Sequence, residues 1–403
     1  MKKHKEKINE KKLKFITYIA LMLGFAQALL MYVESSYFKV SLGSENISIF
    51  YTISYAIALA LLLNMHKIIK LFGKSTSFFL FFFLQIFSVT MLTMVPPSYI
   101  GIVLLMIYIV ASYLVIVLMD IILESFSEDK KSGRIRGFHL TMTNVGFLLG
   151  PFVSTRLLDS FDYFGLFFVA MLINMAIFVV GLIGLRGGNN KFGGNLTVKD
   201  LVKKIFVNKD LMKIYWISFS LEFFYALMVL YTPLYLLDLG MDWKQIGIVF
   251  TIMLIPFTVF GYPAGMLADK KLGEKEMIIG SLLLISISTA SIFFIEGNSV
   301  LIWAAVLFMT RAGAAVLETL RDSYFYKRID ARDMDMISFF RTARSMAYLF
   351  STVLTALILV FFPIKFIFLF IAGAVMCALY PAITLIDNKS EAEMELEYEK
   401  VRI

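Results

Sequence analysis

The chain has 403 residues, of which 59% are hydrophobic and only 17% are charged, and its formal net charge is +8. Soluble globular proteins are about 45–50% apolar and about 25% charged, so this composition excludes a soluble fold. One membrane span needs about 20 apolar residues, and the apolar content suffices for about twelve spans. We therefore expect an all-α polytopic membrane protein.

A hydropathy window of about 19 residues divides the apolar sequence into helical spans. The predicted spans, in chain order, are 15–38, 47–65, 76–95, 99–123, 137–158, 163–185, 214–237, 244–266, 276–294, 299–320, 338–361 and 364–386. The predicted domains are a basic N-terminus (1–14), a six-helix bundle (15–185), a linker (186–213), a second six-helix bundle (214–386) and a tail (387–403). Within the linker, Thr197 to Asp200 predicts a capping box that opens a short amphipathic helix on the membrane surface.

Lysine and arginine are distributed unevenly between the two sides of this topology. The segments on the side of the N-terminus carry 33 basic residues, and the opposite side carries 4. Because basic residues concentrate on the cytoplasmic side, we expect both termini in the cytoplasm and the protein in the cell membrane. The same bias explains the positive net charge without a nucleic-acid partner.

The two predicted bundles are related by an internal repeat. Segment 28–43 matches segment 226–240 at an offset near 198. Two further matches follow in the same chain order, namely Gly73 with Gly273 at an offset of 200, and Asp120 and Glu124 with Glu318 and Asp322 at an offset of 198. Repeats of equal orientation are related by an axis along the membrane normal, so we expect two pseudo-symmetric bundles.

The polar segment after span 244–266 carries a loop pattern. Its members are Gly265, Asp269, Lys270, Gly273 and Lys275. The pattern resembles the cytoplasmic loop motif G-x-L-A-D-R/K-x-G-R/K-R/K of the major facilitator superfamily, with one extra residue before the second glycine. In the first half, Lys70 replaces the aspartate of that motif. The resemblance implies a transporter of two six-helix bundles and a loop that latches the cytoplasmic side.

Span 137–158 carries a second pattern, formed by Gly137, Gly146, Gly150 and Pro151. It is similar to the motif G-x8-G-x3-G-P-x2-G-G of the superfamily's proton-coupled exporters, although Ser154 and Thr155 replace the final glycine pair. The resemblance implies drug/proton antiport. The alternative interpretation is close helix packing, which glycines at such spacing permit.

Charged side chains inside a membrane are costly and need a partner or a function. Arg311, Glu222 and Glu34 lie within predicted spans, on helices that line the central cavity in the family. We predict that they bind substrate or a coupling ion. The alternative is a structural ion pair for Glu222 and Arg311, and contact with the outer membrane interface for Glu34. The uncharged Gln27 and Asn144 are further candidates for the cavity.

Acidic and basic residues also gather at the predicted cytoplasmic ends of the fourth, tenth and eleventh spans. Here we predict a cytoplasmic gate in which acids bridge the basic loops, with proton transfer by Asp120 or Glu318 as an alternative. Its predicted members, in addition to the loop pattern, are Asp120, Glu124, Glu318, Arg321, Asp322, Arg341 and Arg344.

The sequence lacks the residues required for nucleotide binding and for two kinds of metal site. Gly73-Lys74-Ser75 resembles the end of a phosphate-binding loop, but the required first glycine is replaced by Ile68. The sequence has no HExxH motif, and its single cysteine excludes a cysteine metal cluster. We therefore expect no enzyme activity, no cofactor and no metal.

These observations predict a monomeric secondary active transporter that moves a small solute by alternating access, coupled to protons and directed outward. The alternatives are uptake or facilitated diffusion of a sugar or an organic anion, for which Arg311 would be an anchor, and a membrane sensor without transport. The lipid bilayer, protons and the solute are the predicted partners.

Overall fold

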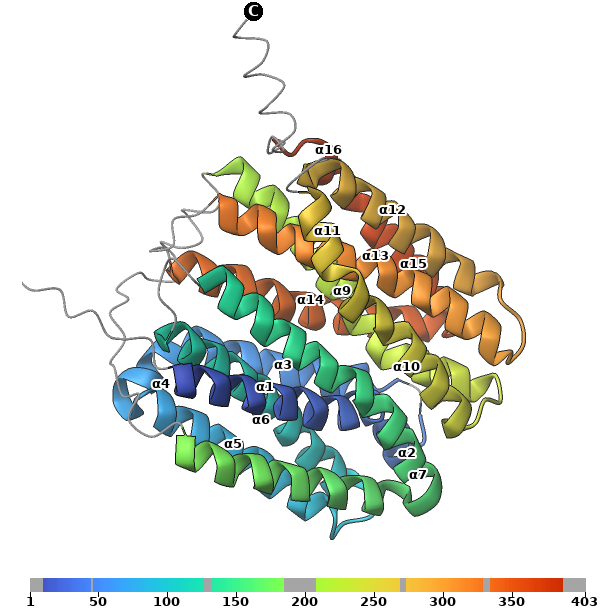
Figure 1. Ribbon diagram of the computed structural model, residues 1–403. Coiled ribbons are helices and arrows are strands. Elements are labelled where there is room, and N and C mark those ends of the chain that lie inside the picture. The colour runs from blue at the N-terminus through green and yellow to red at the C-terminus, as the bar shows by residue number, and fades with distance from the viewer. Residues whose placement is uncertain are drawn as a thin grey trace, which may run out of the picture. The chain divides into compact units, whose positions relative to one another are not determined.

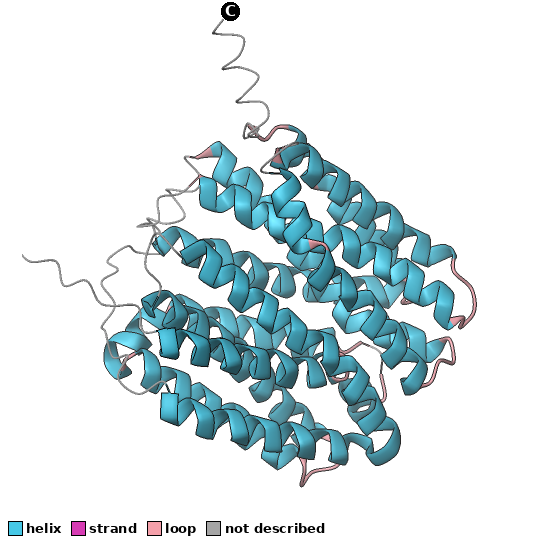
Figure 2. Cartoon of the chain, viewed as in Figure 1, coloured by secondary structure: helices cyan, strands magenta, loops and turns pink. Residues whose placement is uncertain are grey.

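The computed structural model describes residues 10–44, 46–126, 132–184, 208–268, 273–328 and 334–386. Within these ranges the chain is helical with short connections and contains no strand (Figures 1 and 2), so the predicted all-α class is confirmed. The first helices are α1 (Glu10–Met31), α2 (Glu34–Leu42), α3 (Ser48–Leu63), α4 (Met65–Phe72), α5 (Lys74–Leu92), α6 (Tyr99–Phe126) and α7 (Ser132–Gly184). The later ones are α9 (Lys209–Asp238), α10 (Trp243–Val259), α11 (Gly261–Leu267), α12 (Glu274–Ser291), η2 (Ile292–Phe294), α13 (Val300–Lys327), α14 (Met334–Phe361), α15 (Phe366–Cys377) and α16 (Leu379–Ile383). The predicted linker helix lies outside the described residues.

Ten stretches of the described chain are long and apolar enough to cross a membrane, or eleven if the bent pair α3 and α4 forms one span. One of them, Met142–Ile183, has 42 residues, about twice the length that a span requires. It lies in α7, which breaks at Asp162, where φ is 54°. The chain reverses direction there (Figure 1), so α7 contains two predicted spans and the count agrees with twelve.

Contacts divide the chain into two compact units. The first unit contains α1, α2 and α4 to α7, and the second contains α9 to α16. Residues 48–59 of α3 also belong to the second unit. By sequence this helix is part of the predicted first bundle, so its contacts, and not its position in the chain, assign it to the second.

In the first unit, the first predicted span is broken. α1 ends at Met31, and α2 begins at Glu34 after two residues in a turn. α1 packs along α7 at a separation that only small residues allow. A Cβ atom on Gly146 would lie 2.3 Å from the carbonyl oxygen of Leu21, and one on Gly24 would lie 2.5 Å from that of Thr143.

In the second unit, α13 packs against α12, α10 and α9, and α9 also packs against α14. The α3 segment joins this unit through polar and aromatic contacts. The Ser48 hydroxyl is 2.5 Å from that of Tyr231 on α9. Thr52 donates a hydrogen bond of 2.9 Å to Thr352 on α14, and the rings of Tyr55 and Tyr348 are 4.4 Å apart.

The internal repeat extends to backbone conformation. Gly43 and Gly240 both have positive φ, 72° and 83°. Gly73 and Gly273 also match, with φ of 85° and 74°, and each directly precedes a helix, α5 or α12. Because positive φ favours glycine, the two halves keep glycine at equivalent turns.

Candidate functional site

Two neighbouring helices of the second unit, α9 and α13, hold a group of buried and half-buried polar side chains. On α9 they recur at spacings of four and three residues, and on α13 at seven, three and one, so each set lies on one helix face. Both helices are candidate spans. We call the group the α9–α13 charge cluster, which consists of Ser218, Glu222, Tyr225, Arg311, Glu318, Arg321 and Asp322.

Arg321 is the most heavily bonded member of the cluster. It is 7% exposed, and its guanidinium lies 3.0 Å from the carboxylate of Glu222. It also donates to the hydroxyl of Ser218 at 2.9 Å and to the carboxylate of Asp322 at 3.2 Å. Arg344 approaches the second oxygen of Glu222 at 3.9 Å. The charge of Glu222 is therefore balanced by its ion pair with Arg321.

Glu318 has different surroundings. Its carboxylate accepts a hydrogen bond of 3.0 Å from the hydroxyl of Tyr225. Within the described ranges, no lysine or arginine forms an ion pair with it, although the charge of Arg321 acts on it from nearby. Glu318 is thus a membrane carboxyl group held by a neutral donor, and it is chemically able to take up and release a proton.

Arg311 lies deeper in the same span. It is 2% exposed, and its guanidinium carbon lies 5.0 Å from the ring centre of Phe224 and 5.5 Å from that of Tyr225. Its Nε atom is buried without a hydrogen bond. Among the residues that the structure describes, none forms an ion pair with Arg311. Tyr225 therefore contacts a cation through its ring and a carboxylate through its hydroxyl.

The structure brings together five sequence-predicted residues, Glu222, Arg311, Glu318, Arg321 and Asp322, and places Arg341 and Arg344 near them. The charge of Arg341 acts on Asp322. Ser218 and Tyr225 were not among the residues predicted from the sequence. Their spacing of four and three residues from Glu222 was the available signal, but serine and tyrosine are common in apolar spans.

The other predicted substrate residues lie in the first unit. Glu34 is the first residue of α2, directly after the break in the span, and its charge acts on Tyr108. The buried hydroxyl of Tyr108 has no hydrogen-bond partner in the described chain. Gln27 and Asn144 are half-buried and form no hydrogen bond with a described side chain.

The glycine pattern of α7 lies where this helix packs against α1. A Cβ atom on Gly150 would lie 2.2 Å from the Cβ atom of Ala28, as close as the contact described above for Gly146. The hydroxyl of Thr155 donates to the carbonyl oxygen of Pro151 at 2.8 Å, one turn earlier in the same helix. These contacts support close packing as one role of the pattern; Gly137 lies in α7, but no contact is described for it.

The predicted gate loop contacts α13 through an acid that the sequence analysis did not select. Glu274, between Gly273 and Lys275, is 1% exposed. It accepts hydrogen bonds from Ser323 at 3.0 Å and from Lys327 at 2.5 Å. In the described ranges Lys275 forms no ion pair, and Gly265 packs near Thr319. Asp269 and Lys270 lie outside the described residues, as do the side chains of Asp120 and Glu124.

A second missed contact joins the start of α9 to the end of α13. Asp210 forms ion pairs with Lys213 at 3.2 Å and with Arg328 at 2.9 Å. Arg328 and Tyr324 both donate to the carbonyl oxygen of Ile386, at 2.7 and 2.8 Å. This network fastens the segment after α16 to the cytoplasmic ends predicted for α9 and α13.

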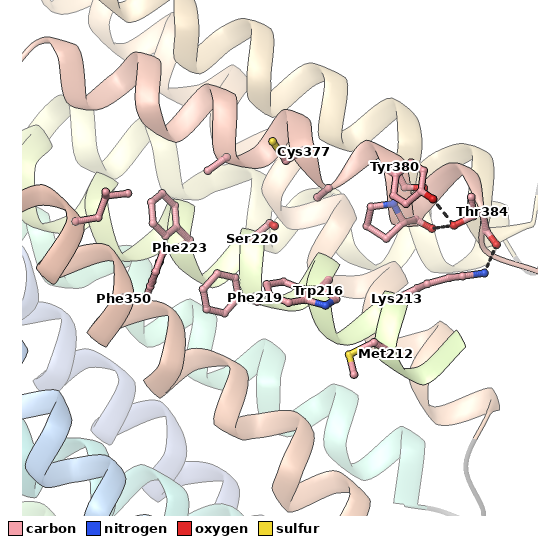
Figure 3. A pocket seen from close by; sticks show the side chains of 14 residues that line it. Met212, Lys213, Trp216, Phe219, Ser220, Phe223, Phe350, Cys377, Tyr380 and Thr384 are labelled. Carbon is pink, nitrogen blue, oxygen red and sulfur yellow. Dashed lines mark hydrogen bonds between the residues drawn. The ribbon is translucent and has the colours of Figure 1, made fainter. Parts of the chain in front are cut away.

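An apolar groove of about 620 Å³ lies between α9, α14, α15 and α16 (Figure 3). Trp216, Phe219, Phe223 and Phe350 form much of its wall. At 3.6 residues per turn, Trp216 points to the side of α9 opposite Tyr225, and no predicted site residue lines the groove. The charge cluster and the groove are therefore separate features of α9.

No group of three or more histidine, cysteine or acidic side chains in the described ranges is arranged to hold a metal ion.

Comparison with known proteins identifies the family. A sequence profile of the Major Facilitator Superfamily matches residues 16–248 and 238–401. The chain belongs to this superfamily. No curated protein matches the chain closely enough to be significant.

Solved structures of other superfamily transporters share the fold. The POT family transporter PepTSo has 11% sequence identity and a TM-score of 0.70, covering 93% of this chain and 97% of that one. An auto-inhibited POT family peptide transporter has 10% identity and a TM-score of 0.72, covering 94% and 98%. The nucleoside transporter NupG has 12% identity and a TM-score of 0.70, covering 94% and 100%. At these identities the likeness concerns the fold.

Membership in the Major Facilitator Superfamily makes this chain an integral membrane protein with a transporter fold. The expectation of membrane transport is thereby supported.

Proposed function

We propose that this protein is a secondary active transporter of the cell membrane, which exports a small solute in exchange for protons by alternating access. The observation that carries the proposal is Glu318, a carboxyl group within a membrane span that is held by the hydroxyl of Tyr225 and by no directly bonded cation in the described chain. A carboxyl group that gains and loses a proton during the cycle couples solute movement to the proton gradient.

Glu318 is better suited to this role than Glu222. The Glu222 carboxylate lies 3.0 Å from the guanidinium of Arg321, so a buried cation already balances its charge. Loss of a proton from Glu318 instead keeps its hydrogen bond with Tyr225. We assign coupling to Glu318, and to Glu222 and Arg321 the task of holding α9 against α13.

The outward direction rests on sequence. The glycine and proline pattern of α7 is similar to that of proton-coupled exporters, and the excess of basic residues on one side supports cytoplasmic termini.

A second candidate is uptake or facilitated passage of a small metabolite, which Arg311 favours because a buried guanidinium suits an organic anion.

The test uses purified protein in proteoliposomes with an imposed proton gradient and a pH-sensitive dye inside. Organic cations, anions and neutral solutes are added in turn, and both dye signal and solute content are followed. We expect solute-dependent proton flux in the intact protein, its loss in Glu318→Gln, and its retention in Glu276→Gln, which alters an exposed acid of α12. Solute movement without proton flux would reject coupling, and accumulation driven inward would favour the second candidate.

A further inference from the structure

The two described arginines within the α13 span have opposite surroundings. Arg321 is bonded to Glu222, Ser218 and Asp322. Arg311 is more deeply buried, at 2% exposure, but contacts two aromatic rings and no carboxylate in the described chain. Arg311, which is less accessible to water than Arg321, is thus the arginine without a bonded counter-ion in the described chain.

A guanidinium is stable inside a membrane protein when an acceptor takes its N–H groups and an anion balances its charge. The rings of Phe224 and Tyr225 offer π electrons, which attract the cation but leave its in-plane N–H groups without strong acceptors. The Nε atom of Arg311 is buried and has no hydrogen bond. Two oxygen atoms of a carboxylate, sulfonate or phosphate match the guanidinium fork.

We propose that Arg311 binds an anionic group of the transported solute, so that the substrates are small organic anions. The inference rests on the proposed transport function and specifies its substrate class. Phe224 and Tyr225 hold the guanidinium from the side, and the solute supplies the oxygen acceptors that the described side chains do not provide.

Tyr225 connects this anion site with the proposed coupling acid. Its ring lies 5.5 Å from the Arg311 guanidinium carbon, and its hydroxyl donates to Glu318 at 3.0 Å. An anion bound to Arg311 changes the electrostatic field at Tyr225 and so acts on Glu318. The anion site and the proton site therefore share one side chain.

The first experiment measures thermal unfolding of the purified protein in detergent with benzoate, benzenesulfonate or phenyl phosphate. Benzyl alcohol and benzylamine are the neutral and cationic counterparts. A ligand that binds only the folded state raises Tm with its concentration. We expect at least one of the three anions, at millimolar concentration, to raise the Tm of the intact protein more than both counterparts.

Three variants test whether Arg311 is responsible. Arg311→Gln removes the charge and is expected to abolish the anion-dependent Tm increase; Arg311→Lys keeps the charge without the fork and is expected to weaken it. Arg156→Gln is the matched control, since Arg156 is exposed and lies 3.4 Å from the ring centre of Phe152. It is expected to behave like the intact protein. Without ligand, Arg311→Gln is expected to unfold at or above the temperature of the intact protein, because no described ion pair is lost.

Two results would overturn the inference. One is an equal Tm increase with anions in the intact protein and in Arg311→Gln, or no anion-selective increase at all. The other is a marked fall in the ligand-free Tm of Arg311→Gln, which would make Arg311 a structural residue. Proton flux driven by a solute without an anionic group would reject this inference alone, whereas anion-selective binding without any proton flux would reject only proton coupling.

Discussion

Arg321 and Glu222 are the buried centre of an ionic group whose members depend on one another. Removing one member of a buried ion pair leaves its partner charged in a medium that solvates it poorly, whereas removing both members leaves neither charge of that pair unbalanced. The bonds of Arg321 to Glu222 and Asp322 therefore matter more for stability than for recognition. Arg311, in the same helix, differs from Arg321 because it contacts aromatic rings and forms no ion pair with a described residue.

The first prediction concerns this pair. Arg321→Gln is expected to destabilise the protein by about 3–5 kcal/mol, because it leaves Glu222 and Asp322 without a bonded cation on α13. The double variant Glu222→Gln, Arg321→Gln is expected to be more stable than Arg321→Gln alone. Thermal unfolding of both singles and the double in one detergent gives the coupling energy. Additive effects would show that the ion pair is unimportant.

The second prediction separates the two functions of Tyr225. Tyr225→Phe keeps the ring beside Arg311 and removes the hydroxyl that Glu318 accepts from. Anion-dependent stabilisation is expected to persist, and solute-driven proton flux is expected to fall by about tenfold or more, within the usual range for loss of a positioned acid–base contact. Tyr262→Phe, at an exposed tyrosine, is the control. Unchanged flux in Tyr225→Phe would remove Tyr225 from the coupling pathway.

At the scale of elements, α1 and α7 are held close by glycines. Membrane helices gain little from burying apolar area against each other, because lipid tails are also apolar, so close van der Waals contact contributes more. The Cβ positions of Gly146 and Gly150 are already occupied by α1. Both glycines therefore act through the distance between the helix axes.

The third prediction follows from that distance. Gly146→Ala is expected to destabilise the protein by about 1–3 kcal/mol, because the added methyl group meets backbone atoms of Leu21 and Phe25. Gly373→Ala is the matched control, since its Cβ would meet nothing within 4 Å and alanine favours a helix by up to about 1 kcal/mol. We expect Gly146→Ala to lower Tm and Gly373→Ala to leave it unchanged or raise it. Equal changes in Tm in the two variants would contradict the packing role of Gly146.

The fourth prediction concerns the contact between the start of α12 and the end of α13. Glu274→Gln removes the charge that Lys327 pairs with and weakens the acceptor for Ser323. Faster amide hydrogen exchange is expected at the start of α12, because local opening becomes easier. Glu276→Gln, an exposed acid in the same turn, is expected to leave exchange unchanged. Equal exchange in both variants would contradict a latch at Glu274.

At the scale of the whole molecule, the boundary between the two units falls within α3, after residue 59. Residues 48–59 pack with α9 and α14, whereas α4 and α5 belong to the first unit. If the proposed cycle rocks one bundle against the other, we expect the contacts of such a helix to change. The contacts of α3 with α9 and α14 include two hydroxyl pairs and one pair of tyrosine rings.

The fifth prediction tests this mobility. Thr52 and Thr352 have hydroxyl oxygens 2.9 Å apart, so cysteines at both positions can approach within disulfide range. In a Cys377→Ser background, oxidation of Thr52→Cys, Thr352→Cys is expected to stop solute flux, and a reductant is expected to restore it. Each single-cysteine variant is the control. Full flux in protein whose disulfide is verified by mass spectrometry would show that α3 stays on α14 throughout the cycle.

The sequence by itself determined the membrane class, the helical spans, the repeat and the superfamily. The spans follow from the lengths of the apolar stretches, and the repeat follows from glycines at equivalent turns such as Gly73 and Gly273. The superfamily follows from a loop motif that occupies only a few consecutive residues. Even the break of α7 at Asp162 was expected, because predicted spans 137–158 and 163–185 end and begin on either side of it.

Only the tertiary structure decided how the charges are paired. The sequence put Glu222, Arg311 and Glu318 in membrane spans, but Glu222 bonds to Arg321, Glu318 bonds to Tyr225, and Arg311 has no bonded carboxylate in the described chain. The assignment of residues 48–59 of α3 to the second unit also could not be predicted from the sequence. Such contacts join residues far apart in the chain, and hydropathy records how apolar a span is but not which neighbour each side chain meets.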